Sequence, residues 1–149
     1  MRHPKWAMVV YLAIGFLVYE GGLCAQDPAD RIKGVWVTAE EDGRVRITKH
    51  EDGQYYGKLV WTENEKNEDS LERDIHNPDP EKRDRTVRGI TLIKGLTYNA
   101  EEEQWVGGKI YDPNQGKTYK CYAELVSDDK LKLRGYIGIS MMGRSTYWK

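Results

Sequence analysis

The sequence predicts an all-β protein, an antiparallel up-and-down barrel of about eight strands. Short β-rich runs recur along the chain, and turn-forming residues separate them. Inside a run the side chains alternate: Leu131 and Leu133 share one face, whereas Lys130 and Lys132 share the other. From residue 26 onwards there are four Trp and eight Tyr, aromatic residues that suit strands. Closure into a barrel would remove the exposed edges of such a sheet.

Residues 1–25 have the pattern of a signal peptide. Arg2 and Lys5 form a basic start, Ala7–Val18 is a run of twelve apolar residues, and Ala25 supplies a small residue for cleavage. The mature chain would then begin at Gln26. We therefore expect an exported protein of the periplasm or the extracellular space.

Two alternatives for this segment are weaker. Twelve residues of helix span about 18 Å, too little for a hydrocarbon core of about 30 Å, so we expect no stable membrane span after signal removal. Cys24 could carry a lipid, but Leu23 before it is not the small residue that a lipoprotein signal favours.

Without Cys24, the remaining Cys121 has no partner for an intrachain disulfide, and its place in an alternating run predicts a buried apolar role.

Length and charge limit the remaining possibilities. The 149 residues carry 23 basic and 24 acidic side chains, and removal of the signal leaves 21 and 23. This near balance argues against a nucleic-acid partner. We expect a short segment at residues 26–33 and one domain at residues 34–149.

The elements follow one another in a simple order. Asp27 can cap, and Pro28 can begin, a single N-terminal helical turn. Asp-Gly pairs at residues 42–43 and 52–53 are typical of tight hairpins. The expected strands cover residues 34–38, 44–49, 54–62, 88–94, 104–111, 117–126, 130–137 and 145–149.

One long loop, residues 63–87, interrupts this series between the third and fourth strands. Loops of this length in compact domains are usually functional or disordered. Within it, Asp74, His76, Asn77 and Asp79 lie close to two prolines, and this composition favours a fixed turn. We predict that Asp74 to Pro80 is ordered and packs against the barrel over one opening. As an alternative, His76 and its flanking carboxylates could bind a metal or catalyse acid-base chemistry.

Several motifs together are similar to a known family. The sequence resembles the exported bacterial family known as domain of unknown function 2147 over residues 34–149. The motifs are Gly34-Val35-Trp36, Asp74 with Asn77-Pro78-Asp79-Pro80, Arg88-Gly89-Ile90, Trp105 to Pro113, Gly116-Lys117-Thr118-Tyr119, Arg134 to Gly138, Gly143-Arg144 and Trp148. The resemblance implies export and these boundaries, and it assigns no activity.

A second resemblance, to lipocalin and avidin-like barrels, rests on Gly34, Trp36 and the late Arg144. Those barrels begin with a Gly-X-Trp strand and often close one end with an Arg packed over the Trp. The resemblance therefore implies that Trp36 is buried at a barrel end with Arg144 stacked on it or hydrogen-bonded beside it.

Aromatic side chains on the strands are the candidate ligand contacts. Strict alternation places Tyr55 and Trp61 on one face of the third strand and Trp105 and Tyr111 on one face of the fifth, with Tyr119 on the sixth. Glycines between these rings leave room for a ligand. Alternatively, the rings fill the core of a small barrel.

These observations favour a non-enzymatic exported barrel that binds a small apolar or amphipathic molecule, or a cell-envelope component, beneath the long loop. One alternative is an envelope enzyme with its chemistry at Asp74, His76 and Asp79. Another is a protein-interaction module that uses the loop as its contact surface. We predict no cofactor and no metal, because the mature chain offers only two histidines and no spacing of converging ligands.

Overall fold

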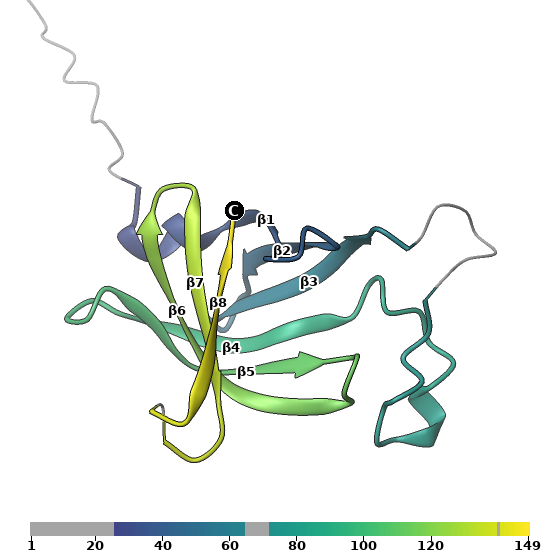
Figure 1. Cartoon of the computed structure of the whole chain (residues 1–149). Helices are drawn as coiled ribbons and strands as arrows, with labels where there is room; N and C mark the ends of the chain where they lie inside the picture. Colours follow the sequence, from purple (N-terminus) through teal and green to yellow (C-terminus); the bar gives the residue numbers. More distant parts are fainter. Residues whose placement is uncertain (1–25, 65–71, 140) are drawn as a thin grey trace, which may run out of the picture.

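The computed structural model describes residues 26–64, 72–139 and 141–149 (Figure 1). The predicted signal peptide with Cys24, residues 65–71 of the long loop, and Ser140 lie outside the described residues. The described elements are two 3-10 helices, η1 (Pro28–Ile32) and η3 (Pro80–Lys82), and the strands β1 (Gly34–Val37), β2 (Gly43–Lys49), β3 (Tyr55–Thr62), β4 (Thr91–Asn99), β5 (Gln104–Asp112), β6 (Lys117–Ser127), β7 (Lys130–Tyr136) and β8 (Gly143–Trp148).

The eight strands form one antiparallel sheet in chain order. The sheet curls so that the C-terminus lies next to β1 (Figure 1). There, Val37 and Lys149 exchange two backbone hydrogen bonds of 2.7 and 3.0 Å, which join the two edges of the sheet. The predicted all-β fold of eight antiparallel strands, with an N-terminal helical turn and one long loop after the third strand, is confirmed.

The fourth strand differs from the expected range of residues 88–94. It runs from Thr91 to Asn99, and Gly89, which has a φ of 94°, belongs to the end of the loop. Gly95 lets the strand continue, because its φ of 75° accommodates an extra residue between the partners of Tyr55 and Gly57 on β3. The predicted strand ends at residue 94 because the bulge at Gly95 interrupts the alternating pattern there.

One end of the curled sheet is covered by η1. Asp27 caps this helix by accepting a hydrogen bond from the Ala29 N–H, and Ile32 is fully buried. Two indoles from the sheet donate hydrogen bonds to this helix. Trp36 Nε1 donates to the Ile32 carbonyl, and Trp105 Nε1 donates to the Ala29 carbonyl, both at 2.9 Å. The core at this end is therefore closed.

β-Bulges invert two of the predicted faces. On β2 and β3 the register shifts, so that Val45 pairs with Leu59 and Arg44 pairs with Trp61. Arg44 lies between the buried Gly43 and Val45 and points outward, so Trp61 points outward too, with the guanidinium 4.9 Å from its ring centroid. The predicted shared face of Tyr55 and Trp61 is wrong, because the bulge adds one residue between them.

The same correction applies to β5. Two residues, Val106 and Gly107, lie between Trp105 and Gly108 on β5, whereas only Tyr122 lies between their β6 partners; Gly107 occupies the bulge with a φ of 76°. Beyond the bulge, Ile110 faces the interior and Tyr111 the outer wall. The predicted shared face of Trp105 and Tyr111 is therefore also wrong.

Trp36 is buried at the η1 end, as the barrel resemblance implied. Arg144 lies elsewhere: it pairs with Gly135 near the start of β8, whereas Lys149 is the residue bonded to Val37 beside Trp36. Lys149 is five positions after Arg144, which corresponds to about 16 Å of extended chain. The expected contact of Arg144 with Trp36 is wrong, because β8 meets β1 through its C-terminal end.

Candidate functional site

A cavity of about 830 Å³ occupies the end of the sheet opposite η1. This volume lies within the range of small-molecule sites. The β1–β2, β5–β6 and β7–β8 turns and both ends of the long loop surround the opening. Its wall combines mostly apolar side chains with a glycine: Leu59, Val87, Leu92, Ile110, Tyr119, Leu133, Gly135, Tyr136 and Trp148.

Thr62 is the unusual member of this wall. The bulge in β3 turns its side chain inward, where it is 6% exposed. Its hydroxyl has no hydrogen-bond partner among the described residues. A buried hydroxyl without a partner is unfavourable, and protein atoms cover this oxygen, so Thr62 offers the cavity no accessible hydrogen-bonding group.

The rim of the cavity is polar and mainly acidic. Glu40, Asp42, Glu72 and Asp112 line the opening, together with Arg144. Asp112 also holds the β5–β6 turn by accepting hydrogen bonds from the Asn114 backbone and the Gln115 side chain. An apolar interior with a polar rim is suited to an amphipathic molecule.

The five predicted aromatic contacts separate into different places. Tyr119 lines the cavity, and its hydroxyl donates to the Gln115 side chain at 3.2 Å. Tyr111 lies at the rim. Tyr55 and Trp105 belong to the closed end, where the Tyr55 hydroxyl donates to Asp30 at 2.7 Å. Trp61 is on the outer wall. The structure thus brings only Tyr119 and Tyr111 to the opening.

The long loop is fixed to the sheet through Asp74. This carboxylate is fully buried and accepts hydrogen bonds from the Tyr111 hydroxyl at 2.6 Å and from the Asn77 amide at 2.7 Å. Arg85 adds two further bonds, from Nε at 3.0 Å and from Nη2 at 2.8 Å, both to Oδ2. Asp74 is therefore the centre of a polar network that joins the two limbs of the loop to β5.

This network shifts the pKa values of both partners. Burial alone would raise the pKa of Asp74, but hydrogen bonds from Tyr111, Asn77 and Arg85 outweigh it and lower the pKa. Burial, followed by the hydrogen bond to Asp74, raises the pKa of Tyr111 to about 12. At neutral pH the network therefore consists of a carboxylate, a neutral phenol and a guanidinium.

The loop also packs against the β5–β6 turn. Gly116 has a φ of 64°, and a Cβ at this position would lie 1.8 Å from the carbonyl oxygen of His76. Only glycine permits this approach. Asp74 to Pro80 is thus packed beside the opening, against the ends of β5 and β6.

Asp74, His76 and Asp79 have separate roles in the structure. His76 is exposed, whereas Asp79 caps η3 and pairs with Lys82 at 2.6 Å. In the described ranges no three His, Cys, Asp or Glu side chains are grouped to hold a metal. Cys121 is buried, and burial raises its pKa to about 12, which disfavours the reactive thiolate.

The sequence of residues 34–149 matches the family described as an uncharacterized protein conserved in bacteria, domain of unknown function 2147. The chain belongs to this family. A comparison with the curated proteins finds no match. Among solved structures, this family member is similar to Helicobacter pylori protein HP1028, described as belonging to the lipocalin family. The identity is 24%, the TM-score is 0.68, and the match covers 78% of this chain and 80% of the other. The likeness shows a lipocalin-like fold.

Only part of the cavity wall can be predicted from the sequence. Leu59, Leu133 and Gly135 follow the plain alternation of their strands, so their inward direction can be predicted from the sequence. Thr62 and Ile110 lie beyond bulges, where strict alternation gives the opposite face. The glycine pair at residues 107–108 marks one of these bulges, whereas the bulge at Val60 has no glycine to mark it.

Proposed function

We propose that this protein is an exported binding protein that takes the apolar part of a small amphipathic molecule into the cavity between β3, β5, β7 and β8. The lipocalin-like fold supports a ligand-binding barrel. Among the described residues η1 covers one end of the sheet, and the cavity lies at the other end, where apolar side chains of several strands line it.

One observation carries the proposal most directly: apolar side chains from separate strands, among them Leu59, Ile110 and Leu133, converge on the same cavity at the end opposite η1. These side chains favour the hydrocarbon part of a ligand. The acidic rim provides acceptors for the polar end of the ligand at the opening.

The export signal is part of the same proposal. A carrier of amphipathic molecules in the cell envelope would need delivery across the inner membrane, for which residues 1–25 have the required pattern. N-terminal sequencing of protein from its native host should find Gln26 as the first residue and no lipid. Diacylated Cys24 would refute this part.

Filling the cavity tests the binding site. Gly135 lines it, and an added Cβ would lie 3.7 Å from Ile110 and from Tyr119, an ordinary contact distance. Gly135→Leu should therefore fold and occupy the space. In a fluorescence titration with N-phenyl-1-naphthylamine, we expect binding at least tenfold weaker than in wild type. Thr97→Leu, which places the same leucine at an exposed position of β4, is the control and should bind as wild type does. Equal affinities in all three proteins would contradict the proposal.

A further inference from the structure

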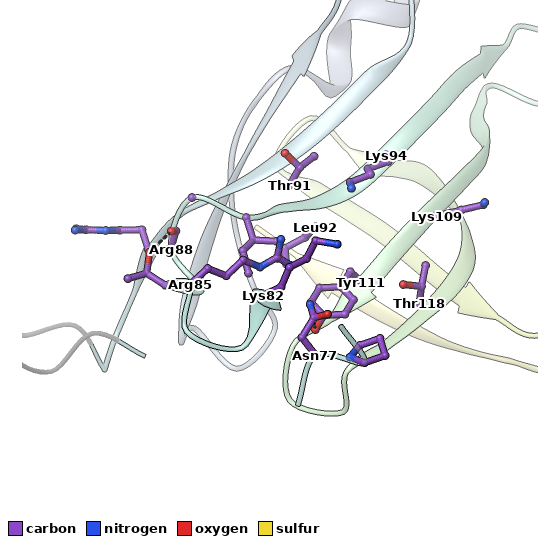
Figure 2. A pocket seen from close by; sticks show the side chains of 14 residues that line it. Asn77, Lys82, Arg85, Arg88, Thr91, Leu92, Lys94, Lys109, Tyr111 and Thr118 are labelled. Atoms are coloured by element: carbon purple, nitrogen blue, oxygen red, sulfur yellow. Dashed lines mark hydrogen bonds between the residues drawn. The ribbon is translucent and has the colours of Figure 1, made fainter. Parts of the chain in front are cut away.

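A second groove, of about 760 Å³, lies on the outer wall, between the long loop and the strands β4, β5 and β6. Figure 2 shows Lys82 and Arg85 approaching it from the loop and Lys94 and Lys109 projecting from the neighbouring strands, whereas Arg88 extends away from the others. The whole chain carries a formal charge of −1. The basic character of this groove is therefore a local concentration.

Three lysines form a ladder across the strands, and two of them, Lys94 and Lys109, line this groove. Lys94 on β4 pairs directly with Lys109 on β5, and Lys109 pairs directly with Lys120 on β6. Directly opposed side chains have Cβ atoms about 5 Å apart, and like charges in this arrangement are destabilising. These direct lysine pairs therefore add no stability to the fold, and a bound anion would offset their repulsion.

The charges of the groove are only partly balanced. Lys82 pairs with Asp79 and Arg85 with the buried Asp74. Within residues 26–64, 72–139 and 141–149, Lys94, Lys109 and Lys120 have no hydrogen bond or ion pair with a side chain. A net positive charge thus remains along the ladder.

The rest of the lining adds neutral hydrogen-bonding groups. Thr91 and Thr118 contribute hydroxyls on the strand side, and Asn77 contributes an amide on the loop side. The loop side is held rigidly, because Arg85 is fixed by two hydrogen bonds to Asp74. Ammonium, guanidinium and hydroxyl groups on both sides of a groove suit the many oxygens of phosphate groups.

We propose that this groove binds a ligand that carries two or more adjacent phosphate groups, held between Lys94 and Lys109 on the strands and Lys82 and Arg85 on the loop. Neighbouring lysines of the ladder have Cβ atoms about 5 Å apart, so the row of charges suits several adjacent anionic groups better than a single one. The site is on the outer wall and is separate from the cavity, so it does not depend on the proposed function. Such phosphates could belong to a soluble oligophosphate or to lipid headgroups.

The test uses the mature chain and two double variants of equal charge. Lys94→Gln with Lys109→Gln removes the centre of the ladder. Arg46→Gln with Lys130→Gln is the matched control, because both residues are exposed and neither lines the groove. Isothermal titration with tripolyphosphate and with citrate measures soluble anions. Sedimentation with vesicles of equal parts phosphatidylglycerol and phosphatidylcholine, compared with pure phosphatidylcholine, measures lipid headgroups.

We expect the ladder variant to bind at least tenfold more weakly than the control variant in one or both assays, with a melting temperature at least as high as that of wild type. Binding of tripolyphosphate identifies a soluble source, and binding of the anionic vesicles alone identifies lipid headgroups. The proposal is overturned if wild type binds neither, if citrate binds as tightly as tripolyphosphate, or if both variants lose affinity equally.

Discussion

The hydroxyl of Tyr111 donates a 2.6 Å hydrogen bond to the buried carboxylate of Asp74, and this contact fixes the long loop to β5. The same tyrosine lines both the cavity and the outer groove. The loop is thereby attached to the wall that separates the two sites. Its described part has the contacts of a brace, with a buried charge at its centre.

Tyr111→Phe should destabilise the protein. The change removes one donor from a buried carboxylate, and hydrogen bonds to charged groups are worth about 1.5–3 kcal/mol. Urea unfolding of wild type and variant measures the loss. Tyr147→Phe, at an exposed tyrosine of β8, should change stability by less than about 0.5 kcal/mol. Equal stability of Tyr111→Phe and wild type would show that the network does not support the fold.

The pH dependence of stability should report the same contact. The raised pKa of Tyr111, about 12 against an ordinary value of 10.0, means that folding favours the neutral phenol. Its contribution is complete below pH 10.0 and is lost as pH rises toward about 12. The stability difference between wild type and Tyr111→Phe should therefore narrow between these pH values. A constant difference would contradict this assignment.

The contribution of Asp74 to stability should depend on pH with the opposite sign. Its pKa is lowered from 3.8, so its contribution is present above that pH and is lost as the pH falls below it. Asp74→Asn should therefore cost stability at neutral pH and cost less in acid. Urea unfolding at pH 7 and pH 3 measures the two differences, and an equal cost at both would count against a charged Asp74.

Gly116→Ala should detach the loop from the β5–β6 turn. The new methyl group would lie 1.8 Å from the His76 carbonyl oxygen, so the loop must move. Gly53→Ala is the matched control: Gly53 also has a positive φ, of 77°, but no atom lies within 4 Å of its added Cβ. Both variants lose about 1 kcal/mol to backbone strain. Hydrogen exchange across Asp74 to Pro80 should accelerate only in Gly116→Ala, and protection in both variants would refute the contact.

Trp36→Ala should be severely destabilising, because the change empties the closed end and removes the indole donor to Ile32. Burial of this size corresponds to about 3–5 kcal/mol, a large part of the stability of a small domain. Val35→Ala, at a neighbouring exposed position, is the control for thermal melting. A small shift of the melting temperature in Trp36→Ala would contradict the role of η1 as the closure of the barrel.

Turn chemistry and alternation were sufficient to predict the strand number, the chain-order topology and the packed loop around Asp74. They were insufficient for the site. Trp61 and Tyr111 were assigned to the wrong face because a single bulged residue inverts everything after it. The position of Arg144 was wrong for a different reason. The register between β8 and β1 depends on how the whole sheet curls, so local sequence does not determine it.

The binding claim is tested most directly by native mass spectrometry of wild type and Gly135→Leu, each purified from the periplasm or culture fluid of the native host. We predict that wild type carries an additional bound mass that dissociates on activation, and that Gly135→Leu, with its cavity filled, is recovered without it. Bare wild type, or the same additional mass on both proteins, would contradict the claim that this cavity is the binding site.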